Sequence, residues 1–158
     1  MTPPTSRRVL RLAVALVVQA LLVGVAVWAP LSARLTGDEI RLRVAPFDPV
    51  DPFRGAYVDL DYSDLPSPEG EGEGAAFVPL TRSGDVWVGG PVTRTRPEGG
   101  PYLACDDASW RLSCGIESLF LPQDEARAME DAVRGGTAVA VLRVDGRGHA
   151  ALLGVEPD

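Results

Sequence analysis

An uninterrupted apolar run near the start of the chain constrains its fold more than any other feature. The run extends from Leu12 to Ala29, reads LAVALVVQALLVGVAVWA, and has Gln19 as its one strongly polar residue. As an α-helix it would be about 27 Å long, close to the ~30 Å hydrocarbon core of a bilayer. Trp28 stands at its far end, where an indole ring favours the headgroup layer, and Pro30 is expected to end the helix. The run therefore predicts a transmembrane anchor.

Two other interpretations of this run fit the residues less well. A buried helix of a soluble domain would carry polar residues at helical spacing, and none recur here. A cleaved signal peptide usually has an apolar region of only ~7–15 residues, followed by a small-x-small site. The best candidate for such a site, Val27-Trp28-Ala29, has a tryptophan in its middle and Pro30 after it. We therefore expect residues 12–29 to be a retained anchor in the lipid bilayer.

The anchor divides the chain into a cytoplasmic tail (1–11), the anchor itself, a polar tether (30–38) and one domain-sized segment (39–158). The number of arginines on each side does not predict the orientation of the anchor in the membrane, because the two counts are equal. Three arginines precede it, Arg7, Arg8 and Arg11, and three follow it, Arg34, Arg41 and Arg43. The first three have no acidic residue nearby, and the two cysteines of the domain suit an oxidising compartment. We therefore expect a single-pass protein of the cell membrane with its domain outside the cytoplasm.

Charge and composition exclude several classes of function. The chain has a net charge of −7, and all 22 acidic residues lie from Asp38 onward. Such a domain repels the phosphates of DNA and RNA, so we expect no nucleic-acid partner. The 15 basic residues are all arginines, and the lack of lysine removes Ser-Lys dyads and Schiff-base chemistry.

The chain also lacks the residues that most catalytic and metal sites require. His149 is the sole histidine, and no Gly-x-Ser-x-Gly motif accompanies it, so we interpret it as an ordinary strand residue. Zinc would need about four ligands at short spacing, which His149 and two distant cysteines do not provide. We therefore expect no catalytic residue, no metal and no cofactor.

Alternation of apolar and polar residues predicts a domain built mainly of β-strands. Apolar residues take every second position in Glu39–Val44 and again in Ala56–Tyr62, after a proline-rich loop. Shorter strands are expected at Phe77–Leu80 and Val86–Val92. The segment Ser63–Gly74, rich in Pro, Glu and Gly, is expected to be a mobile surface loop.

The last third of the chain predicts a helix and then a hairpin. Pro122–Arg134 begins with a proline and two acids, carries an apolar stripe at helical spacing and is followed by two glycines. Thr137–Val144 and Arg147–Val155 then flank Asp145-Gly146, a strong signal for a short hairpin turn. The predicted fold class is mainly β with one packed α-helix (α+β), preceded by a single N-terminal transmembrane helix.

Cys105 and Cys114 are the only cysteines of the chain. Outside the cytoplasm they are candidates for a disulfide that closes a small loop. The alternative, two reduced thiols, stays open, because the geometry that pairing needs cannot be read from spacing.

The stretch between the first two predicted strands carries a recognisable motif, PFDPVDPFRGAYVDLDY from Pro46 to Tyr62. It resembles the signature of the GDYXXLXY family of bacterial membrane-anchored proteins, a Gly-Asp-Tyr-x-x-Leu-x-Tyr run after a DPxDPxRG-like lead-in. The residues that match the signature are Gly55, Tyr57, Leu60 and Tyr62, and those that match the lead-in are Asp48, Pro49, Asp51, Pro52 and Arg54.

One position departs from the signature, because Ala56 stands where the family usually has Asp. If that Asp did chemistry in the family, this chain would lack it. Membership of the family implies an N-terminal anchor and, often, genes for polytopic membrane proteins nearby, but no established activity.

The residue types of the motif also have a structural explanation. Gly55 can adopt backbone angles closed to other residues and let the chain turn out of the proline-rich loop. Leu60 and Tyr62 are expected to pack inward, while Tyr57 covers a neighbouring surface or donates a hydrogen bond. Arg54 is placed to pair with acids of the lead-in. A structural role for the motif is therefore our leading interpretation.

Three hypotheses about function remain after these exclusions. The first is a non-enzymatic interaction module for another membrane protein, such as a polytopic one, held near the bilayer by its anchor. The second is a membrane-tethered surface hydrolase that uses carboxylates between Asp48 and Asp64. The third is a calcium-binding structural module that uses the same acids, although no EF-hand spacing is present.

Overall fold

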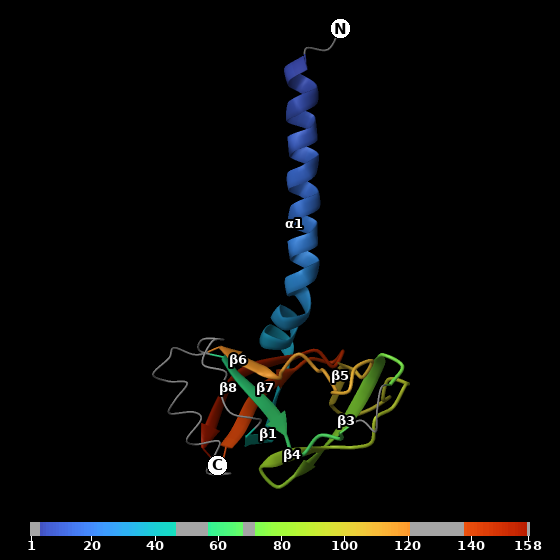
Figure 1. Ribbon diagram of the computed structural model, residues 1–158, viewed down its shortest axis with the longest axis vertical. Helices are drawn as coiled ribbons and strands as arrows, with labels where there is room; N and C mark the ends of the chain where they lie inside the picture. Colours follow the sequence, from blue (N-terminus) through green and yellow to red (C-terminus); the bar gives the residue numbers. More distant parts are fainter. Residues whose placement is uncertain (1–3, 47–56, 68–71, 121–137, 158) are drawn as a thin grey trace.

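The computed structural model describes residues 4–46, 57–67, 72–120 and 138–157. These residues form one long helix, α1, which rises from one face of a β-domain (Figure 1). The bounds of the helix and of the eight described strands are α1 Pro4–Thr36, β1 Asp38–Pro46, β2 Tyr57–Tyr62, β3 Ala75–Ser83, β4 Val86–Gly89, β5 Tyr102–Asp106, β6 Ser118–Phe120, β7 Ala138–Val144 and β8 Ala150–Pro157.

Helix α1 contains the whole predicted anchor and is longer than predicted. The described part from Arg7 to Thr36 is long and apolar enough to cross a membrane. The prediction that Pro30 ends the helix is wrong, because the helix continues to Thr36. Proline removes one intrahelical hydrogen bond and bends a helix without always ending it, and the last turns are offset from the axis above them (Figure 1). Most of the predicted tether at residues 30–38 is therefore helical.

The strands form two antiparallel sheets, as the alternating patterns predicted. The larger sheet has the order β6-β2-β1-β7-β8 and the smaller one β4-β3-β5. Predicted strands Glu39–Val44 and Ala56–Tyr62 correspond to β1 and β2, and the predicted hairpin corresponds to β7 and β8. The fold class is thus confirmed as α+β with mostly antiparallel sheets. The predicted helix Pro122–Arg134 lies outside the described residues.

The smaller sheet differs most from the prediction. Strand β3 is longer than the predicted Phe77–Leu80, and β4 ends at Gly89 instead of Val92. Strand β5 was not predicted, because its successive residues Tyr102 and Leu103 are both buried and so break the alternation. Side chains on both faces of this strand are buried by other parts of the fold. Alternation in the sequence therefore does not reveal it.

A single hydrophobic core lies between the two sheets. Side chains at alternate positions of each strand point into it, as expected for sheets with one buried face. Its members include Ile40, Leu42 and Val44 of β1, Leu60 and Tyr62 of β2, Ala76, Val78 and Leu80 of β3, Leu103 and Cys105 of β5, and Ala138, Ala140, Leu142 and Val144 of β7.

Candidate functional site

The motif strand β2 contributes its last residues to the core. Leu60 is fully buried, and Tyr62 is buried except for a few per cent of its surface. The Tyr62 hydroxyl donates a hydrogen bond of 2.7 Å to the carbonyl oxygen of Ile116. Burial, and next the charge of Glu117, raise the pKa of the Tyr62 hydroxyl, so it stays protonated. The inward packing expected for Leu60 and Tyr62 is present.

The segment between β5 and β6 holds the backbone of the motif strand. The amide of Leu60 donates to the carbonyl of Glu117 at 2.8 Å. The carbonyl of Leu60 accepts from Nη2 of Arg111 at 2.6 Å. Leu60 and Tyr62 are thus the motif residues that bind β2 to this connecting segment by hydrogen bonds. This is a structural role.

Cys105 and Cys114 form a disulfide that closes the connecting segment into a loop. Within it, Asp106 and Ser113 exchange backbone hydrogen bonds of 2.7 and 2.8 Å. Past the disulfide, the carboxylate of Glu117 accepts from the amides of Cys114 and Gly115. The loop is therefore closed by covalent and hydrogen bonds at the same end.

A groove of about 310 Å³ lies between the end of β2 and this loop. Its lining combines apolar side chains with carboxylates and a guanidinium, and comprises Asp61, Tyr62, Leu65, Pro66, Ser67, Trp110, Arg111, Leu112, Cys114 and Glu117. The indole of Trp110 is 70% exposed beside it. Tryptophan and arginine are the residues most enriched at the centres of protein–protein interfaces. This groove, which we call the motif groove, is our candidate binding site.

Two carboxylates in and near the groove are held by neighbouring donors. Both carboxylate oxygens of Glu117 accept hydrogen bonds from backbone amides. The carboxylate of Asp64 lies 3.6 Å from the guanidinium of Arg43. Across the described residues, no group of three or more His, Cys, Asp and Glu side chains is placed to hold a metal ion. The motif residue Gly55, and the lead-in residues Asp48, Pro49, Asp51, Pro52 and Arg54, lie outside the described residues.

A second set of contacts fixes one end of the Pro-Glu-Gly segment. Buried Asp107 accepts two hydrogen bonds from the Arg94 guanidinium, at 2.9 and 2.6 Å, and one from the amide of Gly74 at 3.1 Å. The Arg94 hydrogen bonds hold the pKa of Asp107 below its ordinary value. At the other end, Leu65 packs against the core. Both described ends of the segment predicted to be mobile are therefore attached to the domain, and its middle lies outside the described residues.

A third set of contacts joins α1 to the domain, and its centre is Asp145. The carboxylate of Asp145 accepts hydrogen bonds from Ser32 Oγ at 2.6 Å, from the amides of Arg147 and His149 at 2.8 and 3.0 Å, and pairs with His149 Nδ1 at 3.0 Å. Burial alone would raise the pKa of Asp145, but these hydrogen bonds outweigh it and lower the pKa. Asp145 therefore connects the last turns of α1 to the β7–β8 loop.

Sequence reasoning missed this role of Asp145. It assigned Asp145 and Gly146 to a two-residue turn, whereas the loop between β7 and β8 spans five residues, 145–149. The longer loop forms because the Asp145 side chain accepts from amides further along it. Ser32, Asp145 and His149 do not form a catalytic triad, because Ser32 donates directly to the carboxylate and not to the histidine.

Further contacts press the end of α1 against β7. Ala33 is fully buried, and Arg143 Nη1 donates to the carbonyl of Arg34 at 3.1 Å. Gly37 lies so close that an added Cβ would be 2.4 Å from the Ala33 carbonyl oxygen and 2.8 Å from the Val144 nitrogen. The polar segment between anchor and domain is thus a packed junction instead of a free tether.

Comparison with known sequences supports the resemblance noted above. The sequence family described as GDYXXLXY protein matches residues 19–155, which include most of the anchor and nearly all of the β-domain. No curated protein and no solved structure matches the chain.

Proposed function

Because the chain belongs to the GDYXXLXY family, we propose that it is a single-pass membrane protein whose β-domain binds another membrane protein, without catalysis, outside the cytoplasm. The observation that carries this proposal is the motif groove with its exposed Trp110. The groove lies beside the motif strand that defines the family, and its lining has the chemistry of a protein interface.

Helix α1 supports the membrane part of the proposal. Its large apolar side chains from Val9 to Val25 are half or more exposed, so nothing in the described domain covers them. Lipid chains or the helices of a membrane protein are the surroundings that satisfy such a surface. The disulfide between Cys105 and Cys114 supports a compartment that is oxidising, and hence a domain outside the cytoplasm.

The packed junction supports a partner in the same membrane. Since α1 passes into β1 through Gly37 alone, the domain stays within its own width of the bilayer surface. A protein confined to that layer meets the motif groove at a high effective concentration. Moderate affinity would then suffice, which agrees with a groove of this small size.

Site-specific photo-cross-linking in intact membranes tests the proposal. A photoreactive residue at Ser67, in the motif groove, is expected to form an adduct with one polytopic membrane protein. The same residue at Asp85, in the exposed β3–β4 turn, is the control and is expected to form none. Trp110→Ala should reduce the Ser67 adduct several-fold. Equal adducts from both positions, or none from Ser67, would refute the groove as a binding site.

A further inference from the structure

We propose that the base of α1 carries a binding surface for anionic lipid headgroups, formed by Arg34, Arg143 and Arg147. We call these three residues the base cluster. The proposal depends on α1 being a membrane anchor, as proposed above, and adds a specific lipid chemistry to that role.

Hydrogen bonds place all three arginine residues beside the last turn of the helix. Arg34 belongs to that turn, and Arg143 Nη1 bonds its carbonyl oxygen. The amide of Arg147 bonds Asp145, whose carboxylate also holds Ser32 of the helix. Three residues from α1, β7 and the β7–β8 loop thus converge on one place in an otherwise acidic domain.

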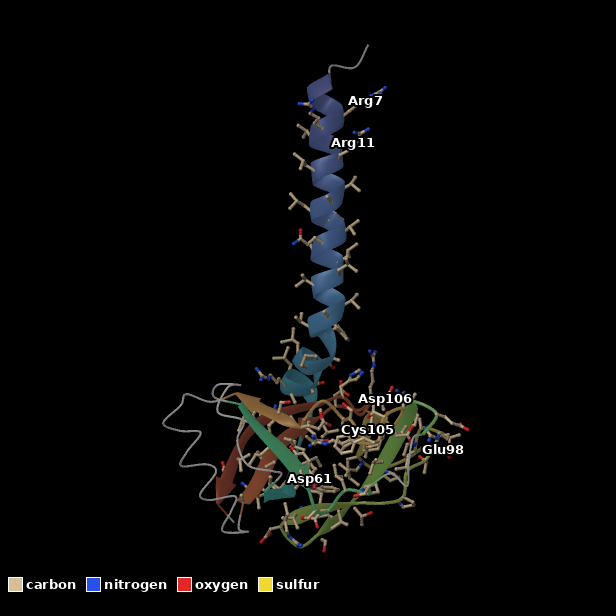
Figure 2. All side chains as sticks on the ribbon, in the orientation of Figure 1. Arg7, Arg11, Asp61, Glu98, Cys105 and Asp106 are labelled. Carbon is tan, nitrogen blue, oxygen red and sulfur yellow. A yellow bond between two sulfur atoms is a disulfide. The ribbon has the colours of Figure 1, made fainter. Side chains whose placement is uncertain are left out.

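The depth of this place matches the headgroup layer. The apolar run ends at Ala29, and Arg34 follows it by five residues, or about 8 Å of helix. The headgroup region on each side of the hydrocarbon core is about 5–8 Å thick. Nitrogen-tipped side chains lie on both sides of the helix base in Figure 2, on the face from which the helix rises. Arg7 and Arg11 occupy the other end of the same helix (Figure 2).

The junction keeps the base cluster facing the bilayer. The hydrogen bond from Ser32 to Asp145, the burial of Ala33 and the close approach at Gly37 prevent the domain from swinging away. A free tether would let charged groups turn toward water. Here the backbone positions of the arginines are fixed before any lipid binds, so only their side chains have to be ordered at binding.

The charges around the base cluster favour a phosphate. Asp145 is buried and accepts several hydrogen bonds, and Glu39 lies 3.2 Å from Arg41. Asp38 is exposed nearby and reduces the positive charge without cancelling three arginines. A guanidinium binds phosphate oxygens in a bidentate manner. Arg34 and Arg147 are exposed, and Arg143 uses only part of its donors on the helix end.

Lipid retention by the full-length protein tests the proposal. The protein is reconstituted into nanodiscs of equal phosphatidylcholine and phosphatidylglycerol, and native mass spectrometry measures which lipids remain bound. We expect phosphatidylglycerol to be enriched. The double variant Arg34→Gln/Arg147→Gln should lose about 25-fold in apparent affinity, about fivefold for each arginine at an anionic surface. Arg143 is left intact because it also caps the helix.

Matched variants separate this effect from general loss of charge or fold. Arg82→Gln removes an exposed arginine near the β3–β4 turn and is expected to change nothing. Arg34→Lys/Arg147→Lys keeps the charge and should retain most of the enrichment. Equal lipid ratios for wild type and the double Gln variant would overturn the proposal, as would an equal loss in Arg82→Gln. Protein that never enters the discs would instead overturn the anchor, and this inference with it.

Discussion

Two buried carboxylates, Asp107 and Asp145, organise different regions of the molecule in different ways. Asp107 accepts from a guanidinium 13 positions away and from an amide 33 positions away. Asp145 accepts from a hydroxyl 113 positions away, from two amides of its own loop, and pairs with the ring of His149. The first carboxylate has a cation as its partner, and the second relies mostly on neutral donors.

The difference separates two roles: Asp107 stabilises the disulfide loop, and Asp145 holds α1 to the domain. Asp107 lies inside the loop closed by the disulfide, so its neighbours are held together covalently as well. Asp145 has no disulfide nearby and is one of several residues that hold the end of α1 against the domain. Loss of Asp107 should therefore weaken one end of the smaller sheet. Loss of Asp145 should loosen the packing of α1 against the β7–β8 loop.

The largest effect is expected from Asp145→Ala. This substitution leaves the Ser32 hydroxyl and two loop amides without their acceptor and should cost about 3 kcal/mol of unfolding free energy. Urea unfolding of the full chain in detergent measures it. Proteolysis should also begin to cut between residues 30 and 38. Asp85→Ala, in an exposed turn, is the control and should change neither readout.

Removal of the disulfide is expected to act on the other region. Cys105→Ala/Cys114→Ala should cost about 2.5 kcal/mol, since the closed loop is short. Hydrogen exchange at the amides of Gly72 and Gly74, which bond Asp107, should become faster. Exchange at Arg147 and His149 should stay unchanged. Faster exchange at all four amides would show that the two regions are coupled. It would contradict the independence of the Asp107 and Asp145 regions.

Asparagine at each position separates the role of charge from the role of shape. Asp107→Asn removes the negative charge that faces Arg94, so the partly exposed guanidinium loses its ion pair with a buried carboxylate. Asp145→Asn keeps an acceptor oxygen for the neutral donors. The interaction that it weakens is the pairing of the carboxylate with the His149 ring. The midpoint of thermal unfolding should fall more for Asp107→Asn, by a few °C. The reverse order would mean that the junction depends on the charge of Asp145.

Acid should weaken both regions gradually, which is the smallest expected effect. Both carboxyls have a pKa below the ordinary value of 3.8 in the folded protein. Their contribution is therefore complete above about pH 4 and is lost as the pH falls through the folded pKa values. Unfolding free energy measured between about pH 6 and pH 2 should show this decline. The double variant Asp107→Asn/Asp145→Asn should decline less steeply.

Much of the fold was predictable because its signals are local. The apolar run predicted α1, strict alternation predicted β1 and β2, and the Asp145-Gly146 turn signal predicted the β7–β8 hairpin. The inward packing of Leu60 and Tyr62 followed from the same alternation. Strand β5 was missed because Tyr102 and Leu103 are buried on both of its sides, which no periodic pattern displays.

The candidate sites were less predictable, since they depend on residues distant in sequence. Trp110 and Arg111 reach the motif strand only because the disulfide loop folds back on it. Arg34 lies more than a hundred positions from Arg143 and Arg147 in the sequence. No spacing rule connects Ser32 with Asp145.

By itself, the sequence determined the apolar helix and the alternating strands, because both depend on the pattern of neighbouring residues. Only the tertiary structure decided that the helix continues past Pro30 to Thr36 and that Asp145 joins it to the last hairpin. The physical reason is that a missing backbone hydrogen bond at one proline can be offset by contacts elsewhere. Here the burial of Ala33 and the carboxylate of Asp145 supply them, so α1 ends in a packed junction with the domain.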